Sequence, residues 1–150
     1  MPVVEESVFI ARTPETVFDF ITDPAKIPVW DASVVAAEPI GSGPLGAGTR
    51  VRGTSKVIGM QFDWVTEQTV FERPTRSVLT SVEGPFTFTV TSTLEPAEGG
   101  TRLTYRIDAD PGLGGVFGRL ADPFIEKAQA RTVRANLDTL AELLTEHQEG

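Results

Sequence analysis

The chain has 150 residues, a size typical of one domain, and its hydrophobic fraction of 40% and charged fraction of 23% exclude a disordered or fibrous class. Its 21 acidic and 13 basic residues give a formal net charge of −8, which repels nucleic acid phosphates and anionic lipid surfaces. The chain has no cysteine, which excludes disulfides and thiolate chemistry. We expect one domain over residues 1–150, a tail at about 146–150, and no nucleic acid partner.

No part of the sequence approaches the roughly 20 consecutive apolar residues that a bilayer-spanning helix requires. The first residues, MPVVEESV, are acidic, whereas a signal peptide begins with positive charge. We therefore expect no membrane span and, by elimination, a cytoplasmic location. The oligomeric state stays open between monomer and homodimer.

The N-terminal third predicts one strand followed by two short helices. Apolar residues of one parity favour a strand from Val3 to Ala11. Thr13 then caps a helix whose first residue is Pro14, and apolar residues between Thr16 and Ile21 give that helix one buried stripe. A second helical turn is expected from Ala25 to Trp30.

The middle of the chain predicts only strands, because alternating segments are separated by glycine, proline and acidic turns. Alternation is clearest after residue 60, where one parity is mostly apolar and the other polar. The short connections are those of hairpins, so the sheet should be antiparallel. The expected strands are 34–40, 49–57, 60–70, 77–83, 86–94 and 101–108.

The C-terminal part predicts a glycine-rich loop and a long helix. Gly112, Gly114 and Gly115 break the strand pattern, and the helical segment 116–146 is interrupted by Pro123. The glycines read either as the hinge of a lid or as a plain connection. Because strands and helices are segregated, the fold class is α+β: a curved antiparallel sheet of about six to seven strands grips the C-terminal helix.

Several short sequence segments occur in an order that restricts the possible topology. They are ESVFI at 6–10, TPETVFDFITD at 13–23, Pro24, Trp30, and GAGTR at 46–50. In this order, over nearly the whole chain, they resemble the START-like, polyketide cyclase/dehydrase (SRPBCC) superfamily with its helix-grip fold. The resemblance implies a deep apolar cavity between the sheet and the long helix, used for lipids, polyketides or other hydrophobic compounds.

Apolar residues on the inward parity are the candidate walls of that cavity, and plain core packing is the alternative for each. Polar residues on the same parity, including Ser55 and Gln68, would orient a ligand or would bond to one another. The ligand-binding candidates are Met60, Phe62, Trp64, Thr66, Thr80, Phe86, Phe88, Ser92, Tyr105, Phe117, Leu120, Phe124 and Ala128.

The sequence offers little acid–base machinery. Its one histidine, His147, lies near the C-terminus, and the carboxylates of Asp63, Glu67 and Asp108 fall on the outward parity. Asp31 lies near a predicted element end, where the mouth of a cavity is one alternative and solvation is the expected state. No spacing matches a calcium loop, a zinc site or a phosphate loop, so we expect neither metal nor cofactor.

Three functions remain open on these grounds. The first is binding or transport of a hydrophobic small molecule, for which no catalytic residue is needed. The second is a cyclase or dehydratase acting on a polyketide-like substrate, with catalytic residues unknown. The third is a stress-response or protein-interaction module. The absence of a convergent acid–base pair favours the first.

Overall fold

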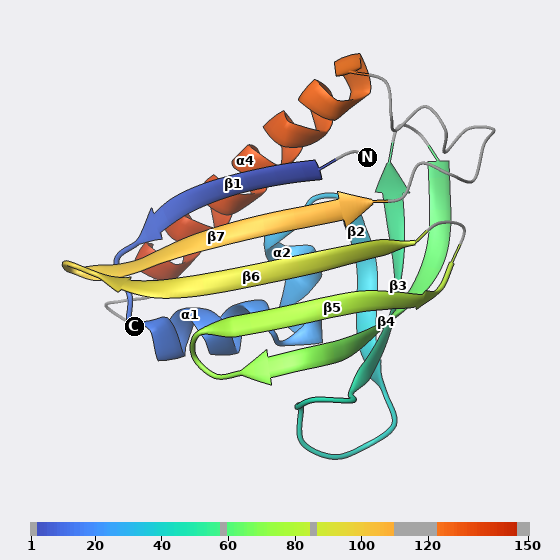
Figure 1. Ribbon diagram of the computed structural model, residues 1–150, viewed down its shortest axis with the longest axis horizontal. Helices are drawn as coiled ribbons and strands as arrows, with labels where there is room; N and C mark the ends of the chain where they lie inside the picture. The colour runs from blue at the N-terminus through green and yellow to red at the C-terminus, as the bar shows by residue number, and fades with distance from the viewer. Residues whose placement is uncertain (1–2, 58–59, 85–86, 110–122, 147–150) are drawn as a thin grey trace.

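A computed structural model of the chain describes residues 3–57, 60–84, 87–109 and 123–146 (Figure 1). The element order is one strand, a helical layer, six more strands and a long helix. The elements are β1 Val3–Ile10, α1 Pro14–Ile21, η1 Pro24–Lys26, α2 Ile27–Trp30, β2 Val34–Ile40, β3 Arg50–Val57, β4 Met60–Glu72, β5 Arg76–Glu83, β6 Phe88–Ala97, β7 Gly100–Ala109 and α4 Pro123–Glu146.

The strands form one seven-stranded antiparallel sheet in the order β1-β7-β6-β5-β4-β3-β2. From β2 to β7 each strand pairs with the next along the chain, as hairpin connections require, and β1 closes the other edge beside β7. The predicted fold class, an antiparallel sheet with two short helices after the first strand and a long C-terminal helix, is confirmed.

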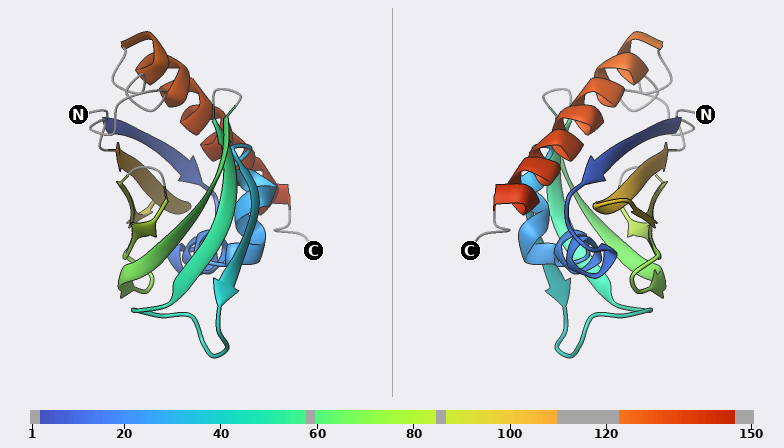
Figure 2. Two further views of the ribbon diagram at one scale, coloured as in Figure 1. Left: turned by 90° about the vertical axis from the view of Figure 1, so that its right-hand side faces the viewer. Right: turned by 90° about the vertical axis from the view of Figure 1, so that its left-hand side faces the viewer.

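The sheet is strongly curved, and β4 carries the bend. Its first half pairs with β3, whereas its second half pairs with β5. Register shifts occur between Val65 and Thr66 and between Gln68 and Val70. Such irregularities bend a strand and increase its twist. Consequently β2 and β3 run at a steep angle to the direction of the other strands, and the sheet has a deep concave side (Figure 2).

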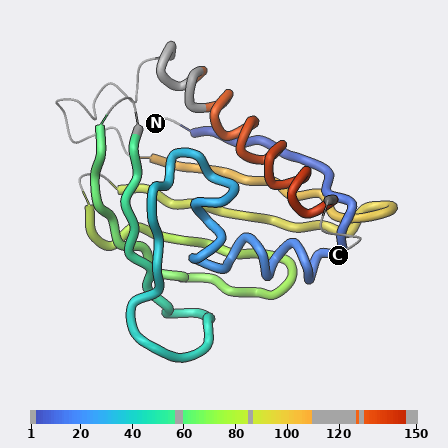
Figure 3. The backbone as a smooth tube through the Cα atoms, turned by 180° about the vertical axis from the view of Figure 1, so that it is seen from behind, coloured from blue at the N-terminus to red at the C-terminus, as the bar shows by residue number. Residues whose placement is uncertain are grey.

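The short helices lie on this concave side (Figure 3). Thr13 caps α1 by accepting a hydrogen bond from the backbone N–H of Thr16 at 3.3 Å, and Pro14 occupies the first turn. The apolar stripe of α1 buries Val17 and Phe18 completely. The Asp23 side chain caps η1 in the same way. The sequence prediction of a capped helix followed by a second helical turn is therefore confirmed.

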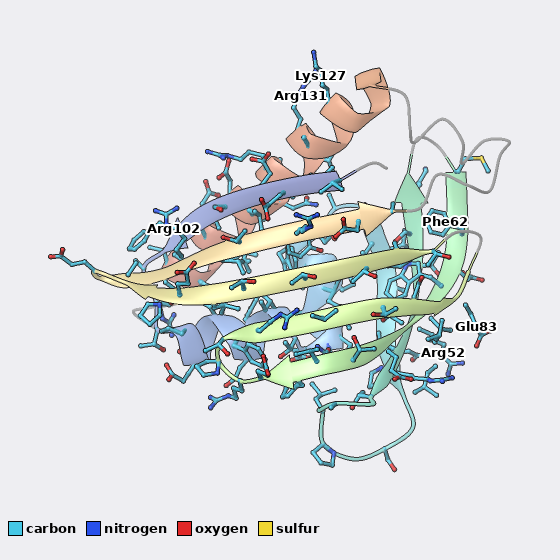
Figure 4. All side chains as sticks on the ribbon, in the orientation of Figure 1. Arg52, Phe62, Glu83, Arg102, Lys127 and Arg131 are labelled. Carbon is cyan, nitrogen blue, oxygen red and sulfur yellow. The ribbon has the colours of Figure 1, made fainter. Side chains whose placement is uncertain are left out.

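The long helix α4 runs beside β1 and packs on it (Figures 1 and 3). Its apolar positions Leu137 and Leu140 are fully buried in the core. Its polar face carries Lys127 and Arg131, which point away from the sheet (Figure 4). The buried core cluster consists of Val4, Ile10, Val17, Phe18, Ile21, Trp30, Leu94, Leu103, Val133, Leu137, Leu140 and Leu144.

Two sequence predictions fall outside the described residues: the glycine-rich loop and the part of the predicted helix that precedes Pro123. Within the described ranges, no helix is both long enough and apolar enough to cross a membrane.

Candidate ligand cavity

A cavity of about 170 Å³ lies between the concave face of the sheet and the short helices. All seven strands contribute to its wall. Its lining is mainly aliphatic and aromatic, with a few hydroxyl, amide and carboxyl groups. The lining residues are Val4, Ile21, Thr22, Pro24, Ile27, Trp30, Asp31, Ser33, Val34, Val51, Ser55, Phe62, Trp64, Thr66, Gln68, Ser77, Leu79, Phe88, Val90, Ser92, Tyr105, Ile107 and Ala109.

The described part of the helical wall of the cavity comes from the short helices. It is formed by α1, η1 and α2, which contribute Ile21, Pro24, Ile27 and Trp30. Among the side chains that the structure describes, none from α4 lines the cavity. The side chains of Phe124 and Ala128 lie outside the described part of the chain, so the contribution of α4 to the wall stays a prediction.

Six of the predicted ligand-binding residues line the cavity. They share the inward parity of their strands, as alternation requires. The six are Phe62, Trp64, Thr66, Phe88, Ser92 and Tyr105. Their position in the wall is a geometric finding, and their contact with a ligand stays a prediction.

Two predicted residues lie elsewhere. Met60 has the inward parity but begins β4 at the end of the sheet, where it is 37% exposed and outside the cavity wall. In β5 it is Ser77 and Leu79 that face the cavity, so Thr80 points to the outer face. The Thr80 hydroxyl there shares a hydrogen bond of 3.2 Å with the hydroxyl of Thr69.

The other predicted residues are not placed. Phe86, Phe117 and Leu120 lie outside the described residues. Phe124 and Ala128 belong to α4, but their side chains lie outside the described part of the chain.

Some polar groups in the wall are satisfied by neighbours on the sheet. The indole N–H of Trp64 donates to Ser55 Oγ at 2.8 Å, across the pair β3–β4. The amide of Gln68 donates to the hydroxyl of Ser77 and to the carbonyl of Val70 at 2.9 Å. These pairs fix the Trp64 and Gln68 side chains as rigid parts of the wall.

Other polar groups in the wall lack a protein partner. Trp30 and Thr66 are 4% and 2% exposed, and Trp30 Nε1 and Thr66 Oγ1 form no hydrogen bond among the described residues. The hydroxyls of Ser92 and Tyr105, which line the cavity, also form no hydrogen bond within the described ranges. A buried polar group without a partner costs about 1–3 kcal/mol, so a molecule that supplies the partner gains affinity.

Asp31 is a carboxylate for which the sequence favoured solvation over a position at the mouth of a cavity. It follows α2 directly and lines the cavity rather than standing in solvent. Its Oδ1 accepts hydrogen bonds from Ser33 N at 3.0 Å, Ser33 Oγ at 2.7 Å and Asn136 Nδ2 at 3.0 Å. Asn136 also accepts from the backbone N–H of Ala32, so α4 fixes the loop that carries Asp31. The spacing of Ile27, Trp30 and Asp31 on one helical turn was the available signal.

The environment of Asp31 shifts two pKa values in the same direction. Removal from water raises the pKa of Asp31, although the bonds from Ser33 and Asn136 oppose the shift. Burial also raises the pKa of Tyr105, and the negative charge of Asp31 adds to that shift. Tyr105 therefore stays protonated and remains a hydrogen-bond donor at any physiological pH.

Replacing Asp31 by asparagine is expected to remove a pH-dependent loss of stability. Since the folded state raises the pKa of Asp31 above 3.8, it holds that proton more tightly than the unfolded state. The contribution of Asp31 to stability is therefore largest below its unfolded-state pKa and falls as the pH rises through its raised folded-state pKa. Urea unfolding between about pH 4 and about pH 8 measures this effect. The free energy of unfolding of Asp31→Asn should rise relative to that of the wild type as the pH rises. The exposed carboxylate variant Asp63→Asn is the control, and a pH-independent difference for Asp31→Asn would contradict the expectation.

The remaining carboxylates predicted to face outward do so. Asp63 accepts from Thr54 Oγ1 at 2.7 Å, Glu67 pairs with Arg50 at 3.2 Å, and Asp108 pairs with Arg106 at 2.9 Å. Within the described ranges, no three histidine or acidic residues gather in a way that could hold a metal ion.

Comparisons with known proteins agree on the fold. A family model described as "Polyketide cyclase / dehydrase and lipid transport" matches residues 1–145. A search of curated proteins gives no significant match.

Solved structures of similar fold come from several bacteria. TTHA0849 from Thermus thermophilus is 24% identical, with 98% of this chain and 99% of that chain covered and a TM-score of 0.81. A START superfamily protein from Mycobacterium smegmatis is 14% identical, with 97% and 99% covered and a TM-score of 0.77. DR_A0006 from Deinococcus radiodurans is 16% identical, with 93% and 95% covered and a TM-score of 0.69. At these identities the likeness shows the fold alone.

Proposed function

Because the chain belongs to the polyketide cyclase/dehydrase and lipid transport family, we propose that it binds a small hydrophobic molecule in the cavity between the sheet and the short helices. The observation that carries the proposal is the composition of the wall. The wall consists mainly of aromatic and aliphatic side chains, with a few polar groups among them. This composition is usual for sites that bind small molecules. Transfer of an apolar molecule from water into such a space is favourable.

A second candidate function, a cyclase or dehydratase reaction, is favoured by one observation. Asp31 and Tyr105 both line the cavity, and a carboxyl group with a raised pKa beside a protonated phenol is suited to general acid catalysis. Either function begins with uptake of a ligand, so binding is tested first.

Ligand uptake can be measured through intrinsic fluorescence, because both tryptophans of the chain line the cavity. Addition of naphthalene is expected to change the tryptophan emission in a saturable way. Ser92→Phe, which places a ring in the cavity, should weaken naphthalene binding by about tenfold or more, or about 1.4 kcal/mol.

The matched control is Thr91→Phe, the neighbouring residue of β6 with the opposite parity. It should bind naphthalene within about twofold of the wild type. Far-UV circular dichroism checks that both variants fold. Equal naphthalene affinity for both variants would place the binding outside the cavity, and no saturable binding to the wild type would end the proposal.

A further inference from the structure

Asp31 presents one of its two carboxylate oxygens without a protein partner. All three hydrogen bonds that the residue accepts go to Oδ1, from two groups of Ser33 and from Asn136. Within the described part of the chain, no hydrogen bond reaches Oδ2. Since the residue lines the cavity, this oxygen is an acceptor available to a bound molecule.

The Tyr105 hydroxyl, a hydrogen-bond donor without a partner among the described residues, lines the same cavity as this acceptor. Trp30 precedes Asp31 in the chain, and its ring meets Tyr105 edge to face, with centroids 5.7 Å apart and an interplanar angle of 84°. Neither Trp30 Nε1 nor the Tyr105 hydroxyl forms a hydrogen bond among the described residues. Trp30 Nε1 is enclosed by protein atoms and closed to a ligand, so the Tyr105 hydroxyl is the donor that a bound molecule can reach. Tyr105 feels the charge of Asp31, which places the two side chains in one electrostatic environment.

We propose that Asp31 and Tyr105 form a hydroxyl-binding site in the wall of the cavity, and that the ligand is a compact apolar alcohol or phenol. This inference rests on the proposed binding function and specifies its ligand class. A ligand hydroxyl donates to Asp31 Oδ2 and accepts from the Tyr105 hydroxyl, so one ligand group gives both side chains a hydrogen-bond partner.

Other head groups fit this arrangement less well. A ketone or an ether only accepts hydrogen bonds, so it leaves Asp31 Oδ2 without a partner. A ligand carboxylate brings a second negative charge beside Asp31 in a poorly solvated space, where like charges repel strongly. A plain hydrocarbon leaves every unpaired group unsatisfied.

The size of the cavity restricts the apolar part of the ligand. Its volume of about 170 Å³ is close to that of an apolar cavity of about 150 Å³ that accommodates benzene in another protein. It is smaller than the roughly 300–1,000 Å³ of sites for drug-sized ligands. One or two fused rings therefore match the space better than a long acyl chain, and naphthalene derivatives are suitable probes.

The test compares four probes of one skeleton by isothermal titration calorimetry at about pH 8, well above the ordinary range for carboxyl groups. The probes are naphthalene, 2-naphthol, 2-methoxynaphthalene and 2-naphthoate. The wild type is expected to bind 2-naphthol about tenfold more tightly than 2-methoxynaphthalene, because only the hydroxyl donates to Asp31 Oδ2. 2-Naphthoate should bind weakest.

Asp31→Asn keeps an acceptor for Ser33 and Asn136 but puts an N–H₂ donor where Oδ2 stood. This variant is expected to lose the preference for 2-naphthol over 2-methoxynaphthalene, measured as the ratio of the two affinities on the same variant. Asp63→Asn, which changes a carboxylate on the outer face, should keep the wild-type preference.

The outcomes separate the two proposals. If naphthalene binds and 2-naphthol and 2-methoxynaphthalene bind equally well to the wild type, the hydroxyl site is wrong but the binding function stands. If Asp31→Asn keeps the full preference, Asp31 is not the acceptor and the site is wrong. If no probe binds, the binding function fails and the hydroxyl site fails with it. The wild-type comparison decides the question even if the variant does not fold.

Discussion

Leu137→Ala is expected to lower the free energy of unfolding by about 3 kcal/mol, because a fully buried leucine is cut back to one methyl group. Leu137 lies in the middle of α4 and belongs to the core cluster that joins this helix to β1 and α1. The packing around the vacated space relaxes only in part, so a cavity term adds to the lost transfer free energy. Urea unfolding of wild type and variant gives the difference.

Asp138→Ala is the control on the same helix, because Asp138 is exposed and its replacement removes no buried surface. Its free energy of unfolding should stay within about 0.5 kcal/mol of the wild type. If Leu137→Ala cost less than about 1 kcal/mol, α4 would not be held by the core contacts described above.

The packing of α4 shows what a sequence pattern predicts well. Val133, Leu137, Leu140 and Leu144 recur at helical spacing and are all buried. In the same way, strict alternation in β4 predicted that Phe62, Trp64, Thr66 and Gln68 would share a face, and all four line the cavity. Periodicity depends only on local backbone geometry, so the residues that share one face of a helix or strand can be predicted without knowledge of the tertiary fold.

The contribution of the short helices to the cavity wall could not be predicted in this way. Which element covers the concave face depends on where β4 bends, and that bend follows from two register shifts that leave no clear mark in the residue pattern. In β5 the sequence pattern predicted Thr80 on the inner face, whereas Ser77 and Leu79 are the residues that line the cavity. A shift of one residue moves every side chain of a strand to the other face, so Thr80 lies on the outer face.

Asp31 was misplaced for a related reason. A carboxylate after a short helix is normally solvated, and the spacing of Ile27, Trp30 and Asp31 is only a weak signal against that expectation. One of its hydrogen-bond donors, Asn136, lies 105 residues away on α4. Only the packing of α4 against the loop after α2 brings the amide to the carboxylate, so the buried state of Asp31 is a property of the tertiary structure.

Gly53→Ala is expected to cost about 3 kcal/mol and to distort the cavity wall. Gly53 pairs with Trp64 across β3 and β4, and the indole lies over the glycine. A Cβ at this position would lie within 3.0 Å of two indole ring carbons and 2.8 Å from the carbonyl oxygen of Ala36. The indole must move, which also breaks its hydrogen bond to Ser55.

Gly46→Ala is the matched control, because a Cβ there meets nothing within 4 Å and its backbone suits any residue. Urea unfolding should show a large loss for Gly53→Ala and little change for Gly46→Ala, and the tryptophan emission should shift only in the former. Adding Trp64→Leu to Gly53→Ala removes the ring that clashes, so the double variant should be less destabilised than the sum of the two single ones. Strict additivity would mean that Gly53 is required for a reason other than the indole. Since Trp64 lines the cavity, Gly53→Ala should also weaken naphthalene binding, which links this strand glycine to the proposed function.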